Sequence, residues 1–247
     1  MERLTIDQPI KPGTKGKMAR IVQEWLGLNG FNVVIDGEYG PATVAAVREF
    51  QQHARLPATG TVDPPTYARL VAPMQAALKP IKPAADAKLG DIVVAYAKQH
   101  LAQHPREIGG QNRGPWVRLY TKGNEGPDWP WCAGFATFVL RQACETHGCE
   151  MPVGSTVSCD LLAADAQRAG CFAKGVATAD RAKVKPGALF LNRRTAGDWV
   201  HTGIVVSTEG DVFHTIEGNT NDAGDREGYE VCARVRGYKD KDFVVFG

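Results

Sequence analysis

Several features that would assign a protein to a particular class are missing from this sequence. No stretch of the 247 residues approaches the roughly 18 consecutive apolar residues of a membrane-spanning helix. Residues 1–18 also lack the apolar core of a signal peptide, so we expect synthesis in the cytoplasm and a separate export route for any external action. An excess of one charge is absent too, because 29 basic and 27 acidic residues leave a net charge of +2. With no long basic run, nucleic acid is not an expected partner, and neither is a membrane.

Cysteine is absent from the first 131 residues, and C-x-x-C pairs are absent throughout. Without an export signal, we do not expect disulfides. The four middle cysteines have spacings unlike those of zinc sites, so we expect no metal and no cofactor. Most of the cysteines are interpreted as small buried hydrophobic residues. The six are Cys132, Cys144, Cys149, Cys159, Cys171 and Cys232.

Composition divides the chain into two parts joined by a linker. Residues 75–89 are rich in alanine, lysine and proline and show poor hydrophobic periodicity, as in a semi-extended linker. Residues 1–74 then form a small first domain, and residues 90–247 form a larger second one. Helical patterns fill the first domain, whereas the second begins with helical patterns and ends in β-rich sequence. The predicted fold class is therefore α+β.

The first domain is predicted to be a bundle of three short helices. Residues 18–28 carry apolar side chains at helical spacing. Gly40-Pro41 and Asp63-Pro64 each place a proline at the favoured first position of a helix, with the aspartate as a cap. The segments GEYGPAT (37–43) and GTVDPPT (60–66) both run from glycine to threonine at the same spacing, which indicates a duplicated turn and helix.

Residues 22–51 resemble the common three-helix peptidoglycan-binding domain. The matching pattern is V-Q-x-x-L-x-L-x-G-F, then D-G-x-Y-G-x-x-T, then A-V-x-x-F-Q, and the likeness covers nearly all of residues 10–73. Most of these positions are core and turn residues that identify a fold. The resemblance implies bacterial peptidoglycan as a partner. We expect Asp36 and Tyr39, in the loop between two helices, to contact it, because tyrosine offers a flat apolar face and a hydroxyl.

The stretch PDWPWCAGF, residues 127–135, begins a predicted helix that carries a cysteine. Apolar residues from Cys132 to Ala143 recur at helical spacing, so Cys132 lies on the buried stripe, as an ordinary core cysteine would. Its position along the helix indicates more, because Pro130 is tolerated only just before or inside the first turn. Free N–H groups and the positive dipole end of a first turn stabilise a thiolate and can hold an oxyanion. We therefore expect Cys132 to be a nucleophile as well as a core residue.

Two segments precede this helix. Residues 90–104 carry apolar side chains at helical spacing and are predicted to be helical. Residues 106–131 are polar and glycine-rich, which favours a surface loop lining a cleft. Within that loop we expect Trp129 to contact substrate and Trp131 to pack beneath the cleft.

A thiolate mechanism also needs a histidine, and His201 is the best candidate. The β-rich tail predicts strands at residues 187–192, 199–207, 211–219, 229–236 and 243–247. A hairpin centred on Glu209 would place His201 opposite Glu217, with Asn219 diagonal on the same face. A carboxylate or amide there would fix the tautomer of the base, whereas His214 should point to the other face. The remaining histidines are expected in the first domain, at the solvated end of a helix, or far along the cysteine helix: His53, His100, His104 and His147.

The succession W-C-A-G-F, V-H-T-G-I-V and I-E-G-N resembles the CHAP group of cysteine amidohydrolases and peptidases, in the NlpC/P60-like, papain-related clan. The likeness covers about residues 90–247. It implies a papain-like domain, in which the cysteine helix packs on an antiparallel sheet, and it implies a catalytic set of Cys132, His201, Glu217 and Asn219. One departure is KPGALF, where relatives often have Gly-Asp and this chain has Ala188 after the glycine.

Together the two resemblances imply a peptidoglycan hydrolase that cleaves an amide bond, acts as a monomer and needs no cofactor. The bond is that of an N-acetylmuramoyl-L-alanine amidase or of a stem or cross-bridge endopeptidase. The missing signal peptide favours a phage or prophage endolysin that acts on the wall after holin-type release. A toxin-type amidase exported by a secretion machine and a non-catalytic wall-binding protein remain alternatives.

Residues 219–230 have spacing like that of a calcium-binding EF-hand loop. Ala223 breaks one ligand position, however, and Asn219 stands where aspartate is usual. A solvated acidic loop is the favoured interpretation.

Overall fold

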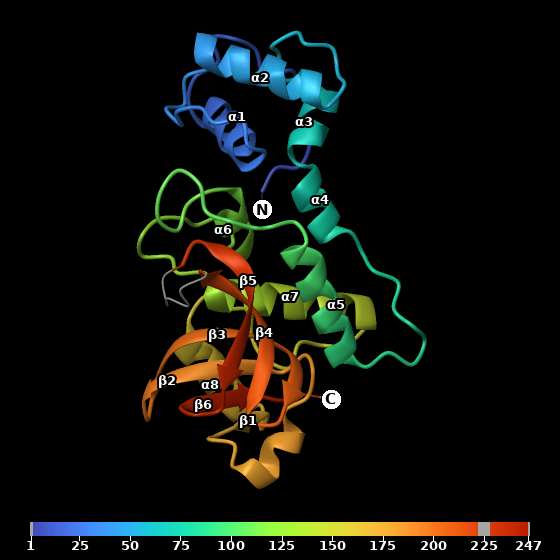
Figure 1. The fold of residues 1–247 in the computed structure, drawn as a ribbon, viewed down its shortest axis with the longest axis vertical. Helices are drawn as coiled ribbons and strands as arrows, with labels where there is room; N and C mark the ends of the chain where they lie inside the picture. The colour runs from blue at the N-terminus through green and yellow to red at the C-terminus, as the bar shows by residue number, and fades with distance from the viewer. Residues whose placement is uncertain (1, 222–227, 247) are drawn as a thin grey trace. The chain divides into compact units, whose positions relative to one another are not determined.

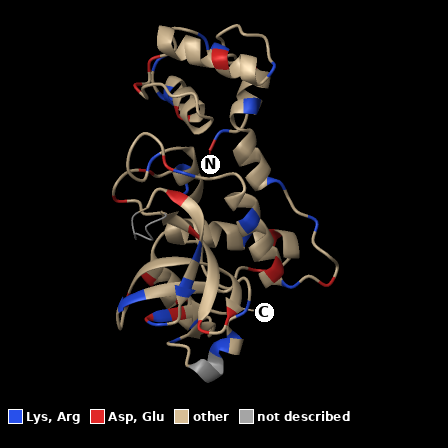
Figure 2. Cartoon of the chain, viewed as in Figure 1, with Lys and Arg blue, Asp and Glu red and all other residues tan. Residues whose placement is uncertain are grey.

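A computed structural model describes residues 2–221 and 228–246 of the chain, without the side chains of residues 178–180. The chain divides into two compact units, and each unit draws on two separate segments. Unit 1 consists of Met1–Leu78 and Arg106–Gly126, and unit 2 consists of Lys79–Pro105 and Pro127–Gly247. Figure 1 labels the helices and strands of both units. In each unit, Lys and Arg are interspersed with Asp and Glu, in keeping with the small net charge (Figure 2).

Unit 1 is helical, and α1 packs against α2, α3 and α6. Its helices are α1 (Lys17–Leu28), α2 (Pro41–His53), α3 (Pro64–Leu70), α4 (Ala72–Leu78) and α6 (Pro115–Tyr120). Trp25 and its apolar neighbours on α1 are buried, as the sequence predicts. The proline starts of α2 and α3 are confirmed, and Asp63 caps α3 by accepting the N–H of Thr66 at 2.9 Å. Residues 75–78 of the predicted linker are the last turn of α4.

The two similar segments, residues 37–43 and 60–66, also have the same hydrogen-bonding pattern in the structure. The Gln23 side chain accepts the N–H of the glycine that opens residues 37–43, at 2.9 Å, and donates to the threonine that closes them, at 3.1 Å. Gln51 makes the same two bonds to residues 60–66, at 2.9 Å and 3.1 Å. Both opening glycines have φ of 74°, a conformation that favours glycine strongly. Each glutamine therefore joins the first residue of one turn to the start of the helix that follows that turn: Gln23 does so for α2 and Gln51 for α3.

Residues 106–126 belong to unit 1, although the sequence analysis placed them in the second domain as a loop lining a cleft. The ring of Trp116 on α6 is buried and lies edge-on to Trp25, with 6.3 Å between the ring centroids. Arg118 forms salt bridges with Glu24 at 2.7 Å and with Glu2 at 2.9 Å. The prediction of a surface loop is wrong for Pro115–Tyr120, because apolar and paired charged side chains of this helix complete the core of unit 1.

Unit 2 combines helices with an antiparallel sheet whose strand order is β1-β6-β2-β3-β4-β5. Helix α7 packs on β3, β4 and α5, and α8 packs on β3 (Figure 1). The elements are α5 (Leu89–Leu101), α7 (Cys132–His147), α8 (Cys159–Arg168), β1 (Phe172–Ala173), η1 (Thr178–Lys183), β2 (Leu189–Thr195), β3 (Asp198–Glu209), β4 (Val212–Thr220), β5 (Glu230–Gly237) and β6 (Lys241–Val244). The α+β class, the cysteine helix on an antiparallel sheet and the first four predicted strands are confirmed. The fifth, predicted at residues 243–247, lies earlier, at Lys241–Val244, and the short strand β1 was not predicted. Strand β2 forms despite the departure at Ala188, which is buried.

A close contact with the sheet fixes the start of α7. A Cβ atom at Gly218 of β4 would lie 2.7 Å from the Cβ of Phe135 and 2.9 Å from the ring of Trp131. Only a residue without a side chain lets the first turn of α7 approach the strand this closely. Trp131 is fully buried in this contact. Among the described residues, no helix is both long and apolar enough to cross a membrane.

Candidate active site

Cys132 is the first residue of α7 and is 4% exposed. Trp131 is the N-cap residue and Pro130 precedes it, so the predicted place of Cys132 in the first turn is confirmed. No side chain of the described residues caps this helix. Cys132 therefore stands at the end of a 16-residue helix where the N–H groups lack helical partners and the helix dipole is positive.

His201 of β3 and Glu217 of β4 form a buried pair, in which His201 Nε2 lies 2.8 Å from Glu217 Oε2. His201 Nδ1 makes no hydrogen bond within the described part of the chain, so it is the ring nitrogen left to serve the thiol. Burial lowers the pKa of His201, but the nearby Cys132 sulfur and the hydrogen-bonded carboxylate of Glu217 outweigh it and raise that pKa to about 9. The imidazole is therefore held in its charged form at neutral pH.

The pKa of the Cys132 thiol lies well below its ordinary value. The largest cause is a hydrogen bond with Cys159, whose sulfur is 3.8 Å from that of Cys132. Burial opposes this effect, while His201 and the backbone N–H of Thr202 lower the pKa further. A lowered thiol pKa beside a raised imidazole pKa describes a thiolate–imidazolium pair, the reactive form of a cysteine nucleophile.

Glu217 is fully buried, and its carboxylate is hydrogen-bonded by the side chains of Arg236 and Thr215 as well as by His201. Arg236 of β5 donates to both carboxylate oxygens, at 2.8 Å and 2.6 Å, and the hydroxyl of Thr215 donates at 2.5 Å. Burial favours the neutral acid, but the bonds from Arg236 and His201 outweigh it and lower the pKa of Glu217 to about 2. The sequence analysis missed Arg236, although a basic residue on a strand next to a buried carboxylate is a usual counter-ion. Gly203 leaves room for this arrangement, because a Cβ atom there would lie 2.6 Å from Glu217 Cγ.

The predicted register of the β3–β4 hairpin is wrong, although His201 and Glu217 meet. The turn lies later in the chain than predicted: it is formed by Gly210 and Asp211 rather than centred on Glu209, which pairs with Val212. A β-bulge between Val205 and Ser207 then shifts the pairing by one residue, so that Ile204 faces Ile216. Continuing this spacing places His201 opposite Asn219 and diagonal to Glu217, the reverse of the prediction. Without the bulge, the side chains of His201 and Glu217 would lie on opposite faces of the sheet.

Asn219 lies at the end of β4 and is 1% exposed. Its φ of 54° is in the left-handed region, and its carbonyl accepts the N–H of Gly228 at 3.2 Å. Neither polar atom of its side chain makes a hydrogen bond within residues 2–221 and 228–246. Of the two residues predicted to orient His201, Glu217 is therefore the one that is hydrogen-bonded to the ring. The central part of the EF-hand-like segment 219–230 lies outside the described residues.

Residues 15–70 match the family model described as "Putative peptidoglycan binding domain". The chain carries a peptidoglycan-binding domain. It is accordingly a cell-wall-associated protein with peptidoglycan as a partner. The matched residues cover α1 to α3 and lie within unit 1. A comparison with curated proteins finds no match.

Within the peptidoglycan-binding domain, the two predicted contact residues have different settings. Tyr39 is 2% exposed and donates its hydroxyl to the carbonyl of Gly60 at 2.9 Å. Its ring has no face open to a ligand, so the predicted wall contact through Tyr39 is wrong. Asp36 is exposed, and the N–H of Glu38 and the side chain of Gln23 lower the pKa of its carboxyl. Its carboxylate thus shapes the turn and remains open to solvent.

The other predicted residues lie in unit 2. Trp129 is half-buried three residues before Cys132. His100 is fully buried rather than solvated, and its Nε2 lies 2.7 Å from the Gln142 side chain. This burial lowers the pKa of His100 to about 4. His104 is more exposed and pairs with Glu230 at 2.6 Å.

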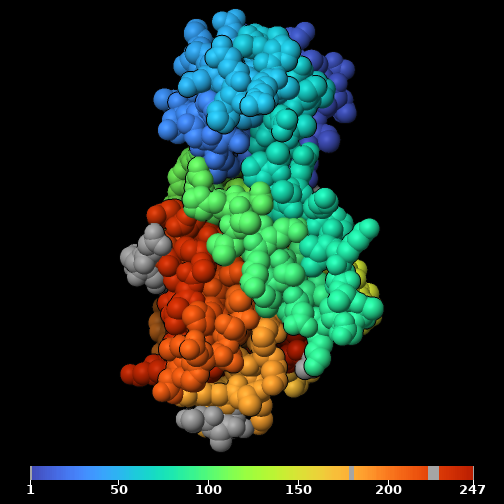
Figure 3. Space-filling view, turned by 45° about the vertical axis from the view of Figure 1, so that its right-hand side comes forward, coloured from blue at the N-terminus to red at the C-terminus, as the bar shows by residue number. Residues whose placement is uncertain are grey.

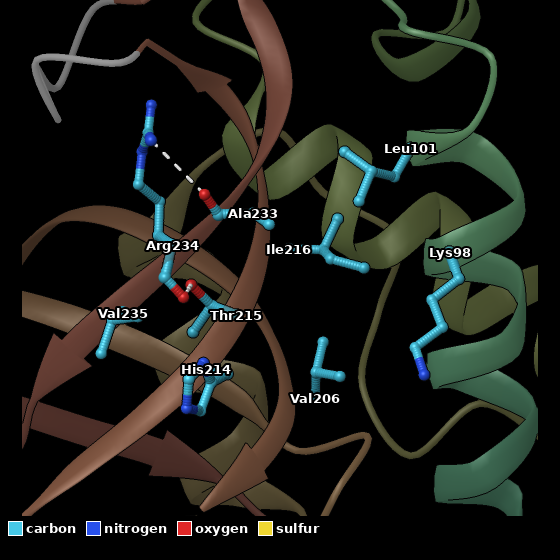
Figure 4. Close-up of a pocket in the computed structure, with 9 residues that line it drawn as sticks. All are labelled: Lys98, Leu101, Val206, His214, Thr215, Ile216, Ala233, Arg234 and Val235. Carbon is cyan, nitrogen blue, oxygen red and sulfur yellow. Dashed lines mark hydrogen bonds between the residues drawn. The ribbon is translucent and has the colours of Figure 1, made fainter.

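A separate groove lies between α5 and strands β3, β4 and β5 (Figure 4). The α5 surface runs beside the orange and red surface of these strands (Figure 3). His214 lines this groove, but Cys132, His201 and Glu217 do not. Because side chains alternate along β4, His214 lies on the opposite face of the strand from Glu217, as predicted.

Proposed function

We propose that the chain is a peptidoglycan hydrolase, in which unit 2 is a papain-like cysteine amidase or peptidase of the CHAP type. The observation that carries the proposal is the buried set of Cys132, His201 and Glu217, in which His201 Nε2 lies 2.8 Å from Glu217 Oε2. The lowered pKa of the Cys132 thiol and the raised pKa of the His201 imidazole favour a thiolate–imidazolium pair there. A charge pair without function is costly to bury, and shifted pKa values of this kind cluster at catalytic sites. The peptidoglycan-binding domain of the same chain would raise the local concentration of wall substrate.

In the proposed reaction, the Cys132 sulfur attacks the carbonyl carbon of an amide in peptidoglycan. The developing oxyanion accepts hydrogen bonds from first-turn N–H groups of α7, including that of Cys132. The His201 imidazolium gives its Nδ1 proton to the leaving amine as the C–N bond breaks, which leaves a thioester and a neutral imidazole. The imidazole then takes a proton from water as the water attacks the thioester. Release of the carboxylic acid restores the thiolate and the imidazolium.

Glu217 keeps the His201 ring oriented and stabilises its charge, and Arg236 keeps Glu217 ionised. Both act through other groups and are positioning residues. The scissile bond is proposed to be the N-acetylmuramoyl–L-alanine amide or a peptide bond of the stem or cross-bridge.

Hydrolysis of purified cell walls by the full chain tests this proposal. The wild type should clear a wall suspension and release soluble fragments, and Cys132→Ala should abolish clearing while wall pull-down is retained. Cys144→Ala is the matched control, because Cys144 is a buried cysteine at the other end of the same helix. Clearing by Cys132→Ala at the wild-type rate would remove Cys132 from the mechanism, and an inert wild type would reject the enzyme. Mass spectrometry of the released fragments identifies the bond.

We further propose that the protein acts as a phage or prophage endolysin. Expression inside a bacterium should then leave cells intact until a membrane-permeabilising protein is supplied separately. Lysis should follow at once with the wild type and should not follow with Cys132→Ala. Lysis by the wild type without that second protein would contradict the endolysin proposal and leave the chemistry in place.

A further inference from the structure

Two buried cysteines meet at the candidate active site. Cys132 is the first residue of α7, Cys159 is the first residue of α8, and their sulfur atoms are 3.8 Å apart. Both side chains are in the core, at 4% and 7% exposed. The mechanism above needs a thiolate at Cys132 but assigns no chemical step to the second thiol.

We propose that Cys132 and Cys159 form a site of reversible oxidation, in which Cys159 captures the oxidised sulfur of Cys132 as a disulfide. The proposal deepens the proposed function and rests on it for the consequence, because the sulfur that becomes blocked is the proposed nucleophile. The oxidation itself requires only a reactive thiolate with a second thiol in reach.

The geometry supports formation of the bond. A disulfide has sulfur atoms about 2.05 Å apart, so the present separation has to shrink by about 1.8 Å. Shared between the two side chains, this is about 0.9 Å for each sulfur, a displacement within the range of side-chain rotation. The two residues stand at the starts of α7 and α8, both of which pack on β3.

The reaction balances with a hydroperoxide as the oxidant. The Cys132 thiolate attacks the outer peroxide oxygen, the O–O bond breaks, and the alkoxide or hydroxide takes up a proton. Cys132 is then a sulfenic acid, oxidised by two electrons, and the peroxide is reduced to an alcohol or water. The Cys159 sulfur attacks the Cys132 sulfur, and its proton leaves with the hydroxyl group as water. A dithiol reverses the change by thiol–disulfide exchange.

The chain offers a matched pair of cysteines at the other end of α7. Burial, with hydrogen bonding to Cys149, raises the pKa of Cys144 to about 12. Thiolate attack from Cys144 is therefore slow at neutral pH. Peroxide should discriminate between the two pairs if the thiolate at the start of α7 drives the reaction.

The test uses the reduced full-length protein, about two molar equivalents of hydrogen peroxide at pH 7 so that sulfenic acid can go on to sulfinic acid, alkylation of the remaining thiols, and peptide mapping by mass spectrometry. We expect a peptide linked through Cys132 and Cys159, with Cys144 and Cys149 alkylated, and a parallel loss of hydrolysis that dithiothreitol restores. In Cys159→Ala and Cys159→Ser, peroxide should instead carry Cys132 to the sulfinic acid, and dithiothreitol should not restore hydrolysis.

Peptide mapping keeps this inference separate from the proposed function. A linked peptide from a protein that never clears walls would support the oxidation site and reject the hydrolase. Sulfinic acid at Cys132 in the wild type without a linked peptide would overturn the oxidation site, even where walls are cleared. Mapping of the wild type does not depend on the folding of any variant.

Discussion

Substitution of Glu217 by glutamine tests the electrostatic core of the candidate site. The change keeps the size of the side chain but removes the negative charge that lies 2.8 Å from His201 Nε2. The imidazolium then has one anionic neighbour, Cys132, instead of two. We expect the pKa of His201 to fall, because less charge offsets the burial that lowers it.

The size of the change follows from the shift itself. The pKa of His201 rises from 6.5 to about 9 through its interactions with Cys132 and Glu217. If Glu217 supplies half of this rise, its neutralisation lowers the pKa by at least about one unit, or about 1.4 kcal/mol. The alkaline limb of the pH profile of kcat/KM should move down by the same amount. Loss of ring orientation should also lower the rate at pH 7 by about 10²-fold, the lower end of what acid–base catalysis contributes.

Stability gives a second readout of the same substitution. The pKa of Glu217 is lowered from 4.5 to about 2, so its stabilisation is complete above pH 4.5 and is lost as pH falls toward 2. The shift corresponds to about 3 kcal/mol of unfolding free energy in the wild type. Urea unfolding at several pH values in this window should show that loss in the wild type and little of it in Glu217→Gln.

Glu230→Gln is the matched control, since Glu230 also pairs with a histidine, His104, at 2.6 Å in unit 2. It should leave the pH profile of hydrolysis unchanged. The reasoning fails if Glu217→Gln keeps the alkaline limb of the wild type, because Glu217 then does not hold the imidazolium. It fails as well if both glutamine variants move that limb equally.

Three further predictions concern neighbouring features of the molecule. Arg236→Met removes two hydrogen bonds to a buried carboxylate and should lower the unfolding free energy in urea by about 2 kcal/mol, with an acid limb of hydrolysis at higher pH. Gly203→Ala forces Glu217 to move and should slow wall clearing about tenfold, whereas Gly197→Ala, whose Cβ meets nothing within 4 Å, should not. Tyr39→Phe loses a buried hydroxyl bond and should lower the unfolding free energy by about 1 kcal/mol, while pull-down on peptidoglycan stays unchanged.

The sequence predicted the elements that local patterns determine. The spacing of apolar residues predicted helices α1 and α7. Proline and aspartate predicted where α2 and α3 begin, and runs of β-branched residues predicted the strands of the tail. Cys132 could be placed in a first turn because Pro130 restricts where a helix begins. His201 and Glu217 could be placed on one face only by an assumed turn, and the actual hairpin reaches that result through a different turn and a bulge. Register depends on turn geometry, which these residues alone do not specify.

The residues that the sequence analysis missed act through tertiary contacts. Arg236 reaches Glu217 from the neighbouring strand β5, and Cys159 reaches Cys132 from the start of α8. His100 ends a helix whose sequence looks polar, yet Gln142 on α7 satisfies its ring and allows burial. In each case the partner lies 19 or more positions away in the chain, so no short motif contains both members.

The chain passes between the two units three times, and composition marks only the first passage. Residues 79–88 after α4 have the composition of a linker, whereas the passages near residues 105 and 126 carry only Pro105 and Gly126-Pro127 as breaks. Such breaks are common in any glycine-rich segment and do not say which core a segment joins. That choice is made by burial: Trp116 joins Trp25, and Arg118 neutralises Glu24, which is fully buried. Glu24 is itself a clue in the sequence, because a buried acidic residue on α1 needs basic partners. It pairs with Arg20 on its own helix at 2.9 Å and with Arg118 at 2.7 Å.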